Sequence, residues 1–327
     1  MNNRRKFIVA LGVGSLAIPR IASAQTTGRT YHLGWLASAD LFKEPHYLAF
    51  VQRLTELGLV EGRNLSIERR QGDNNLAKLP ALATELATLR CDVFFGGGIE
   101  ANLAALVNAS RDIPIVFVAV DFDPVAAGYV ARLARPGGRV TGITALQSLL
   151  PAKRLEILKD MLPTAGKVAV FTNAEASGQL SVAEAAARRL GFSLHIVDFK
   201  RPPFDYEAGF ADAVRAKVDA VFVLGSGLWV PGRRKIIDLA LKARLPTVFH
   251  QFDWVGAGGL VSYGFNFPTL WRRGAEMAAS ILRGGKPSEI PMEQPTTYEL
   301  AINLKTAKAL RITIPDIVMV RATRVIE

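Results

Sequence analysis

The chain has 327 residues, a formal net charge of +11 and a hydrophobic content of 50%, which fits two ordinary domains and excludes a disordered protein. A single cysteine, Cys91, excludes an intrachain disulfide, and four scattered histidines lack metal-ligand spacing, so we expect no metal site. The basic residues fall in helical patterns without a DNA-binding signature, so we expect no nucleic-acid partner.

The first segment of the chain has the pattern of a cleaved export signal. It begins with Arg-Arg-Lys at 4–6 and continues with an apolar run over 7–18, which is shorter than the about 20 residues that span a bilayer. Ala-Ser-Ala at 22–24 is a small-residue cleavage site. We therefore expect residues 1–24 to be a signal peptide, cleaved after Ala24, and the mature protein to be soluble and periplasmic.

The export route stays open at this stage. The paired arginines resemble a twin-arginine signal, but Asn2 and Asn3 stand where that signal usually has a Ser/Thr start. Both the Tat route and the Sec route are compatible with the segment.

Strand and helix patterns alternate through the rest of the chain. The predicted strands cover 31–37, 64–70, 91–98, 113–120, 139–144, 167–172, 192–199, 219–225, 246–251 and 259–265. The predicted helices cover 46–58, 76–90, 100–110, 123–134, 152–162, 180–190, 206–217 and 230–243. A long helix over 268–283, a turn, a strand over 297–304 and a short helix follow. This alternation predicts an α/β protein with two doubly wound lobes, each built on a parallel sheet.

Polar, glycine-rich and aromatic residues follow the carboxyl ends of these predicted strands. The segments concerned are 37–40, 96–102, 121–124, 172–178, 225–229 and 250–254. Ligands of doubly wound sheets bind outside the carboxyl ends of the strands. The sequence therefore predicts a ligand site between the two lobes.

Several long segments closely resemble the ABC transporter substrate-binding proteins of the tryptophan/tyrosine-binding type. They are GLVEGRNLSIERR, IPIVFVAV with DFDP, LARPGGRVTGIT, KRLEILKDMLP, EQPTTYELAINLKTAKALRITIP and RATRVIE, and the resemblance covers the mature chain. It implies the type I periplasmic-binding-protein fold, with two Rossmann-like lobes joined by a three-crossing hinge. Lobe I would comprise 28–146 and about 264–288, and lobe II 147–263 and about 289–327.

The resemblance also implies a function. Such a protein binds a small solute in the cleft, here an amino acid, an aromatic acid or a similar molecule, and delivers it to an ABC permease in the inner membrane. It is not an enzyme and uses no cofactor, and we expect a monomer. The family's NPANP-like loop is TNAEASG here, in which only Asn173 matches, so the resemblance does not identify the solute.

The segment FFGGGIEAN over 94–102 is the most suggestive candidate site. Gly97 and Gly98 allow a ligand to approach the backbone, and the start of the following helix favours an anion. Glu100 would compete for the same helix end, so carboxylate binding there stays open.

The other candidate ligand-binding residues lie at other strand ends. Asp121 and Asp253 could bind an ammonium or hydroxyl group, polar side chains could bond across the cleft, and aromatic rings could stack on a flat solute or belong to the core. These candidates are Ser38, Asp121, Asn173, Ser226, Trp229, Phe252 and Asp253.

Two alternatives share parts of this pattern. Gly96, Gly98 and Ala101, with Asp121 after the next strand, fit a loose dinucleotide-binding motif and suggest an exported NAD(P)-dependent oxidoreductase. That motif belongs to the first strand–helix turn, however, and here it follows the third strand. A LacI-type ligand sensor would need a DNA-binding headpiece before residue 30, where the signal pattern stands.

The signal pattern generates a direct prediction. N-terminal sequencing of the protein from a periplasmic fraction should begin at Gln25, because cleavage follows the Ala-Ser-Ala site. Replacing Arg4 and Arg5 by Lys should block export only if the twin-arginine route is used. Recovery of the chain solely as a cytoplasmic form with intact Met1 would contradict the prediction.

Overall fold

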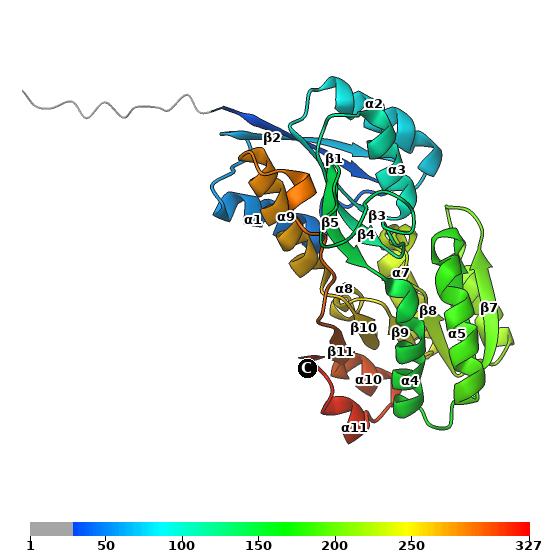
Figure 1. Cartoon of the computed structure of the whole chain (residues 1–327). Helices are drawn as coiled ribbons and strands as arrows, with labels where there is room; N and C mark the ends of the chain where they lie inside the picture. Colours follow the sequence, from blue (N-terminus) through cyan, green and yellow to red (C-terminus); the bar gives the residue numbers. More distant parts are fainter. Residues whose placement is uncertain (1–28) are drawn as a thin grey trace, which may run out of the picture.

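The structure, a computed structural model, describes residues 29–327, so the predicted signal peptide lies outside the described residues. Two α/β lobes lie one above the other in Figure 1, and each contains a mostly parallel sheet flanked by helices. The chain passes between the lobes more than once, and its carboxyl end lies on the lower lobe. The predicted fold class is confirmed.

The first lobe contains a five-stranded parallel sheet in the order β2-β1-β3-β4-β5. Its strands are β1 (Tyr31–Ala37), β2 (Leu65–Gln71), β3 (Val93–Gly98), β4 (Ile115–Val120) and β5 (Val140–Ala145). The helices between them are α1 (Pro45–Glu56), α2 (Leu79–Thr88) and α3 (Glu100–Ala109). The central strands β3 and β4 are almost fully buried because helices cover both faces of the sheet, which explains their continuous apolar runs.

The second lobe contains a seven-stranded sheet in the order β12-β11-β10-β9-β8-β6-β7. Its strands are β6 (Lys167–Asn173), β7 (Ser193–Phe199), β8 (Ala220–Val223), β9 (Thr247–Phe249), β10 (Val261–Gly264), β11 (Glu299–Asn303) and β12 (Arg324–Ile326). The helices are α4 (Pro151–Met161), α5 (Ser177–Leu190), α6 (Tyr206–Arg215), α7 (Arg233–Ala243), α8 (Phe252–Gly256), α10 (Leu304–Leu310) and α11 (Asp316–Met319). β11 is antiparallel to β10, an exception to the predicted parallel sheet, because it enters from the first lobe.

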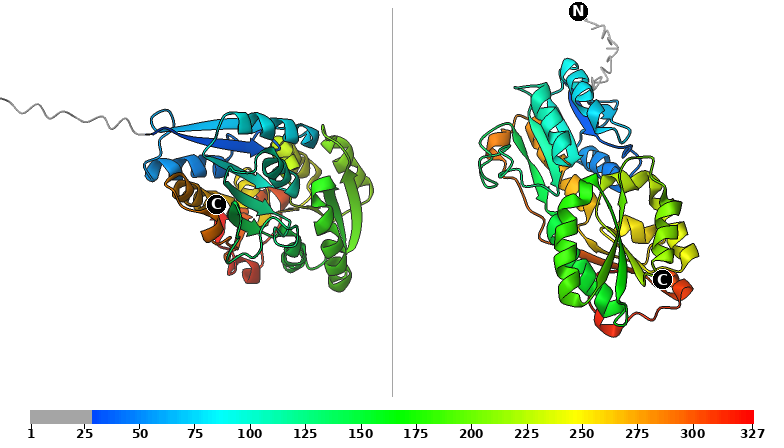
Figure 2. Two further views of the ribbon diagram at one scale, coloured as in Figure 1. Left: turned by 45° about the horizontal axis from the view of Figure 1, so that its top comes forward. Right: turned by 90° about the vertical axis from the view of Figure 1, so that its right-hand side faces the viewer.

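Helix α9 (Phe267–Leu282) belongs to the second half of the sequence but lies beside α1 on the first lobe, as the orange and blue helices show in Figures 1 and 2. The chain then runs along β5, where Thr144 N donates to Glu293 O at 2.8 Å and Glu293 N donates to Gly142 O at 2.9 Å. Three segments therefore cross between the lobes: one after β5, one after β10, and one between Glu293 and β11.

Both sheets reverse their strand order at one point. In the first lobe β2 and β3 lie on opposite sides of β1, and in the second β7 and β8 lie on opposite sides of β6. At such a switch point the loops after the two central strands diverge and leave a crevice. The loops after β1 and β3 and those after β6 and β8 therefore define where a ligand can bind.

The predicted helix over 123–134 is wrong. Asp123 Oδ1 instead accepts hydrogen bonds from Val125 N at 2.8 Å and Ala126 N at 3.3 Å, and turns follow as far as the start of β5. Gly128 adopts a φ of 80°, outside the helical range. An aspartate side chain that accepts hydrogen bonds from nearby backbone amides stabilises a turn in place of a helix, and here the turn forms. Helix α8 was not predicted, because its five residues are too few to show a helical period.

None of the helices within residues 29–327 combines the length and the apolar character needed to cross a membrane.

Candidate functional site

A cavity lies between the lobes at the two switch points. Its volume, counted as the space open to the centre of a water-sized sphere, is about 90 Å³, several times the roughly 10–15 Å³ that one water needs. The cavity is lined by the strand-end loops of both sheets, by helices α1 and α9, and by the first crossing segment. The lining residues are Ser38, Leu41, His46, Gly97, Gly98, Ile99, Val120, Asp121, Gln147, Glu175, Gly225, Ser226, Gly227, Val230, His250, Gln251, Phe267 and Trp271. The cavity can therefore hold a small solute.

The cavity brings together five of the predicted ligand-binding residues: Ser38, Gly97, Gly98, Asp121 and Ser226. Asn173 lies directly behind them, since its Nδ2 donates to Ser226 Oγ at 3.1 Å and its Oδ1 accepts from Glu175 N at 3.0 Å. It supports two lining residues without lining the cavity itself.

The remaining predicted residues lie elsewhere. Trp229 is fully buried in the core of the second lobe, where its Nε1 donates to Leu224 O at 2.8 Å. Phe252 and Asp253 begin helix α8 and line a much smaller recess, in which the Arg324 guanidinium lies 3.5 Å from the centre of the Phe252 ring. Of the two aromatic residues predicted to stack on a solute, Trp229 thus belongs to the core and Phe252 packs against Arg324.

Several lining residues were missed by the sequence reasoning: His46, Gln147, Glu175, His250, Gln251, Phe267 and Trp271. Three of them stood in strand-end segments that the sequence had marked, namely Glu175, His250 and Gln251. His46 and Trp271 lie in helical patterns that resemble ordinary core faces, and no local signal sets them apart.

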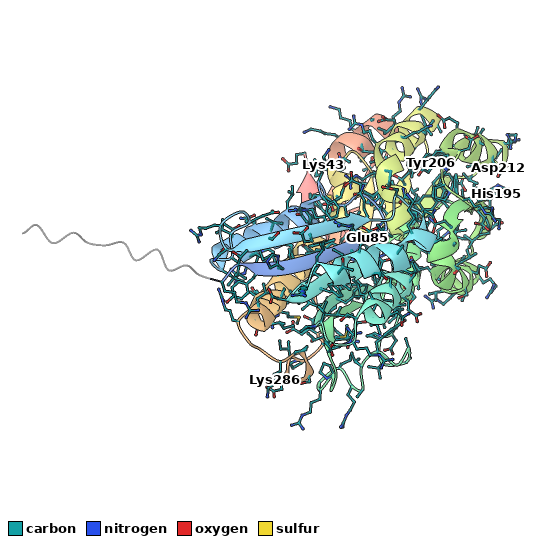
Figure 3. All side chains as sticks on the ribbon, turned by 90° about the horizontal axis from the view of Figure 1, so that it is seen from above. Lys43, Glu85, His195, Tyr206, Asp212 and Lys286 are labelled. Atoms are coloured by element: carbon teal, nitrogen blue, oxygen red, sulfur yellow. The ribbon has the colours of Figure 1, made fainter. Side chains whose placement is uncertain are left out.

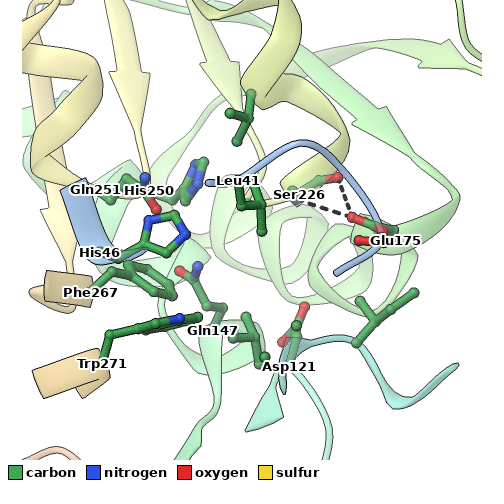
Figure 4. A pocket seen from close by; sticks show the side chains of 18 residues that line it. Leu41, His46, Asp121, Gln147, Glu175, Ser226, His250, Gln251, Phe267 and Trp271 are labelled. Atoms are coloured by element: carbon green, nitrogen blue, oxygen red, sulfur yellow. Dashed lines mark hydrogen bonds between the residues drawn. The ribbon is translucent and has the colours of Figure 1, made fainter. Parts of the chain in front are cut away.

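One side of the cavity carries two carboxyl groups, as Figure 4 shows. Asp121 Oδ2 accepts from Gln179 Nε2 at 2.8 Å, while its buried Oδ1 has no hydrogen-bond partner among residues 29–327. Glu175 Oε2 accepts from Ser226 Oγ at 2.7 Å and Gly227 N at 3.1 Å. Burial raises the pKa of both carboxyl groups, against the opposing effect of these hydrogen bonds. A cationic group of a solute would relieve that cost.

The other side of the cavity is aromatic (Figure 4). The Trp271 ring lies 4.8 Å from the His46 ring and 5.5 Å from the Phe267 ring, centre to centre. Burial lowers the pKa of His46 and of His250 to about 3, and nearby arginines add to the effect, so both imidazoles are neutral at pH 7. Trp271 Nε1 and the Nδ1 atoms of both histidines have no partner within the described part of the chain. This side can receive a flat group and bond to its edge.

The start of helix α3 also faces the cavity. Gly98 has a φ of 118°, and a Cβ atom on Gly97 would lie 2.5 Å from the Trp271 ring, so both positions favour glycine. Ile99 at the N-cap offers no side-chain bond to the first amides of the helix. Glu100 is exposed and accepts from Tyr129 Oη at 3.2 Å, outside the cavity. Its carboxylate therefore does not occupy the helix end.

A histidine–acid pair does exist, but outside the cavity. His195 Nε2 lies 2.6 Å from Asp212 Oδ2 at the outer edge of the second lobe, on edge strand β7 and helix α6 (Figure 3). Within the described range no three His, Cys, Asp or Glu side chains lie close enough to hold a metal ion.

Comparisons with known proteins identify relatives of the chain. A family model described as ABC transporter substrate binding protein matches residues 46–326. The tyrosine-binding protein of Clostridioides difficile (strain R20291) is 27% identical over 271 residues, which cover 80% of this chain and 75% of that protein.

Two solved structures share the fold. The ABC domain from Streptococcus pneumonia in complex with L-Trp has a TM-score of 0.75 at 23% identity and covers 90% of this chain and 100% of its own. The ligand-free, open structure of an adhesive substrate binding protein from Clostridium difficile has a TM-score of 0.62 at 25% identity and covers 91% of this chain and 99% of its own.

The buried imidazoles generate a prediction about pH. The unfolded chain protonates these histidines near pH 6.5, whereas the folded chain does so only near pH 3, so stability falls as the pH is lowered through that window. Between pH 7 and pH 5 each histidine should account for a loss of about 2 kcal/mol. Urea unfolding should measure the free energy of unfolding of the wild-type protein, His46→Asn and His250→Asn at both pH values. In each variant the loss of free energy between pH 7 and pH 5 should be smaller than in the wild-type protein by that amount. Equal losses in all three proteins would contradict the assignment.

Proposed function

The chain belongs to the ABC transporter substrate-binding protein family, and we propose that it is the exported component that carries one small solute to a permease in the inner membrane. The family and the relatives are binding proteins for ABC transporters, not enzymes. The oxidoreductase and LacI-type sensor alternatives are therefore wrong. The pattern of an export signal over 1–24 supports a periplasmic location for the mature protein, which we propose acts as a soluble monomer.

The proposed solute is an aromatic amino acid. The single observation that carries this proposal is the division of the cavity into a carboxyl side, with Asp121 and Glu175, and an aromatic side, with Phe267 and Trp271. An ammonium group would pair with the free Oδ1 of Asp121, and the ring would lie against the aromatic side. The uncapped start of α3 suits the solute's carboxylate. The tyrosine-binding and L-Trp-bound relatives support the same class.

Two polar contacts join the lobes beside the cavity and would favour its closed form. Arg233 on α7 and Glu44 before α1 form a double hydrogen bond, at 2.8 Å and 3.3 Å, with both side chains largely buried. Gln179 on α5 bonds to Asp121 across the cleft at 2.8 Å.

A thermal-shift screen of the mature protein tests the proposed solute class. L-tryptophan, L-tyrosine or L-phenylalanine at 100 times its Kd should add about 2.7 kcal/mol to the free energy of unfolding and raise the Tm. Solution scattering should show a smaller radius of gyration with that amino acid, because the solute binds the closed form better. If no aromatic amino acid raises the Tm while another solute does, the proposed class is wrong.

The contact between Glu44 and Arg233 should contribute to affinity. Glu44→Gln removes the charged pair, which joins the two lobes, and should weaken binding of the amino acid found in that screen by about 1 kcal/mol, or several-fold in Kd.

Glu56→Gln is the matched control, because Glu56 pairs with Arg53 and Arg272 within the first lobe. Calorimetric titration should find an unchanged Kd for this variant. Equal Kd values for the two variants would contradict the role of the Glu44 contact.

A further inference from the structure

A fully buried arginine stands behind the cavity. Arg154 on α4 has 0% of its surface exposed, and its Nε donates to Tyr263 O at 2.7 Å. Its Nη2 donates to Gln147 Oε1 at 2.5 Å, and its Nη1 has no partner among the described residues. A charge buried this deeply is costly unless hydrogen bonds and an opposite charge compensate it, so its place beside the cavity needs a reason.

The arginine determines which way the Gln147 amide faces. A guanidinium can only donate hydrogen bonds, so the atom of Gln147 that contacts Arg154 must be the carbonyl oxygen. The amide nitrogen, Nε2, is therefore turned to the other side, near Gly225, where a Cβ atom would lie only 3.1 Å from it. Both Gln147 and Gly225 line the cavity. No acceptor for Nε2 is found within residues 29–327.

We propose that Arg154 holds Gln147 so that its amide nitrogen donates a hydrogen bond to the carboxylate of the solute, which makes Gln147 a determinant of specificity for acids. The proposal rests on the proposed function and deepens it. No lysine or arginine is among the residues that line the cavity, so recognition of a carboxylate depends on neutral donors. Gln147 lies between the carboxyl side and the aromatic side in Figure 4, where the backbone of an amino acid would stand.

The same arginine connects solute binding to the hinge. Gln147 belongs to the crossing segment after β5, and Tyr263 lies near the end of β10, just before the second crossing. Arg154 bonds to both and so connects the first crossing segment to the strand that leads into the second. Arg154 is thus a positioning residue, which acts on the solute through Gln147.

Two pairs of probes separate recognition of the carboxylate from binding in general. L-tryptophan and tryptamine, and likewise L-tyrosine and tyramine, share the ring and the ammonium group and differ only in the carboxylate. Calorimetric titration of the mature wild-type protein should give a lower Kd for each acid than for its amine. Gln147→Glu keeps the bond to Arg154 but replaces the donor by an acceptor, so it should reduce this preference by at least about tenfold.

Two further variants exclude simpler explanations. Gln251→Glu makes the same change of charge on another wall, where the amide already donates to Asp253 Oδ2 at 3.2 Å, and it should reduce the preference less. Arg154→Lys keeps the positive charge but cannot hold both partners, so it should lower the preference as well, whereas a merely structural loss would weaken acid and amine alike.

The outcomes distinguish this inference from the proposed function. Three results would each overturn the role of Gln147 but not solute binding itself. The amines could bind the wild-type protein as tightly as the acids, Gln147→Glu could leave the preference for acids intact, or Gln251→Glu could reduce that preference equally. If neither the acids nor the amines bind the wild-type protein, the proposed solute class fails and this inference fails with it.

Discussion

The site depends on one constraint: two parallel sheets present their carboxyl ends to the same cleft. Each sheet reverses its order next to its first strand, so the loops after β1 and β3 and those after β6 and β8 leave two crevices that face each other. Backbone amides and polar side chains of these loops line the cavity, together with side chains of helices α1 and α9. A solute held in the cleft contacts both lobes at once, and binding can therefore be coupled to closure.

The fold could be predicted because its signals are local. Apolar runs and helical spacing gave the strands and helices of both sheets, and the strand-end rule located Ser38, Asp121 and Ser226. The late return of α9 to the first lobe was implied by the family resemblance. The site was less predictable because many of its residues come together only through tertiary packing. His46 and Trp271 come from two helices far apart in the sequence that lie together only because α9 packs on α1.

The aromatic residues of the second lobe also show why the site could not be fully predicted from the sequence. Trp229 stands at a strand end, where a ligand contact was expected, yet it fills the core and bonds to the backbone of its own loop. A large ring is stabilised by burial wherever a cavity of its size exists, and sequence alone does not say whether a solute or the protein supplies the other surface. The tryptophan that lines the cavity is Trp271 instead, contributed by the first lobe.

The cleft carries its charges in an unusual balance. Its walls hold two carboxyl groups, two neutral histidines and neither lysine nor arginine, while the buried guanidinium of Arg154 stands behind Gln147. A lysine or arginine on the wall would pair with Asp121 and fill the site with an internal ion pair, leaving nothing for a zwitterion to satisfy. Arg154 lies behind Gln147 instead of on the wall, so its charge favours the carboxylate of Asp121 without bonding to it. The Oδ1 atom of Asp121 therefore stays available to a solute. In the proposed function, the free Oδ1 of Asp121 and the amide nitrogen of Gln147 would together recognise a zwitterionic solute.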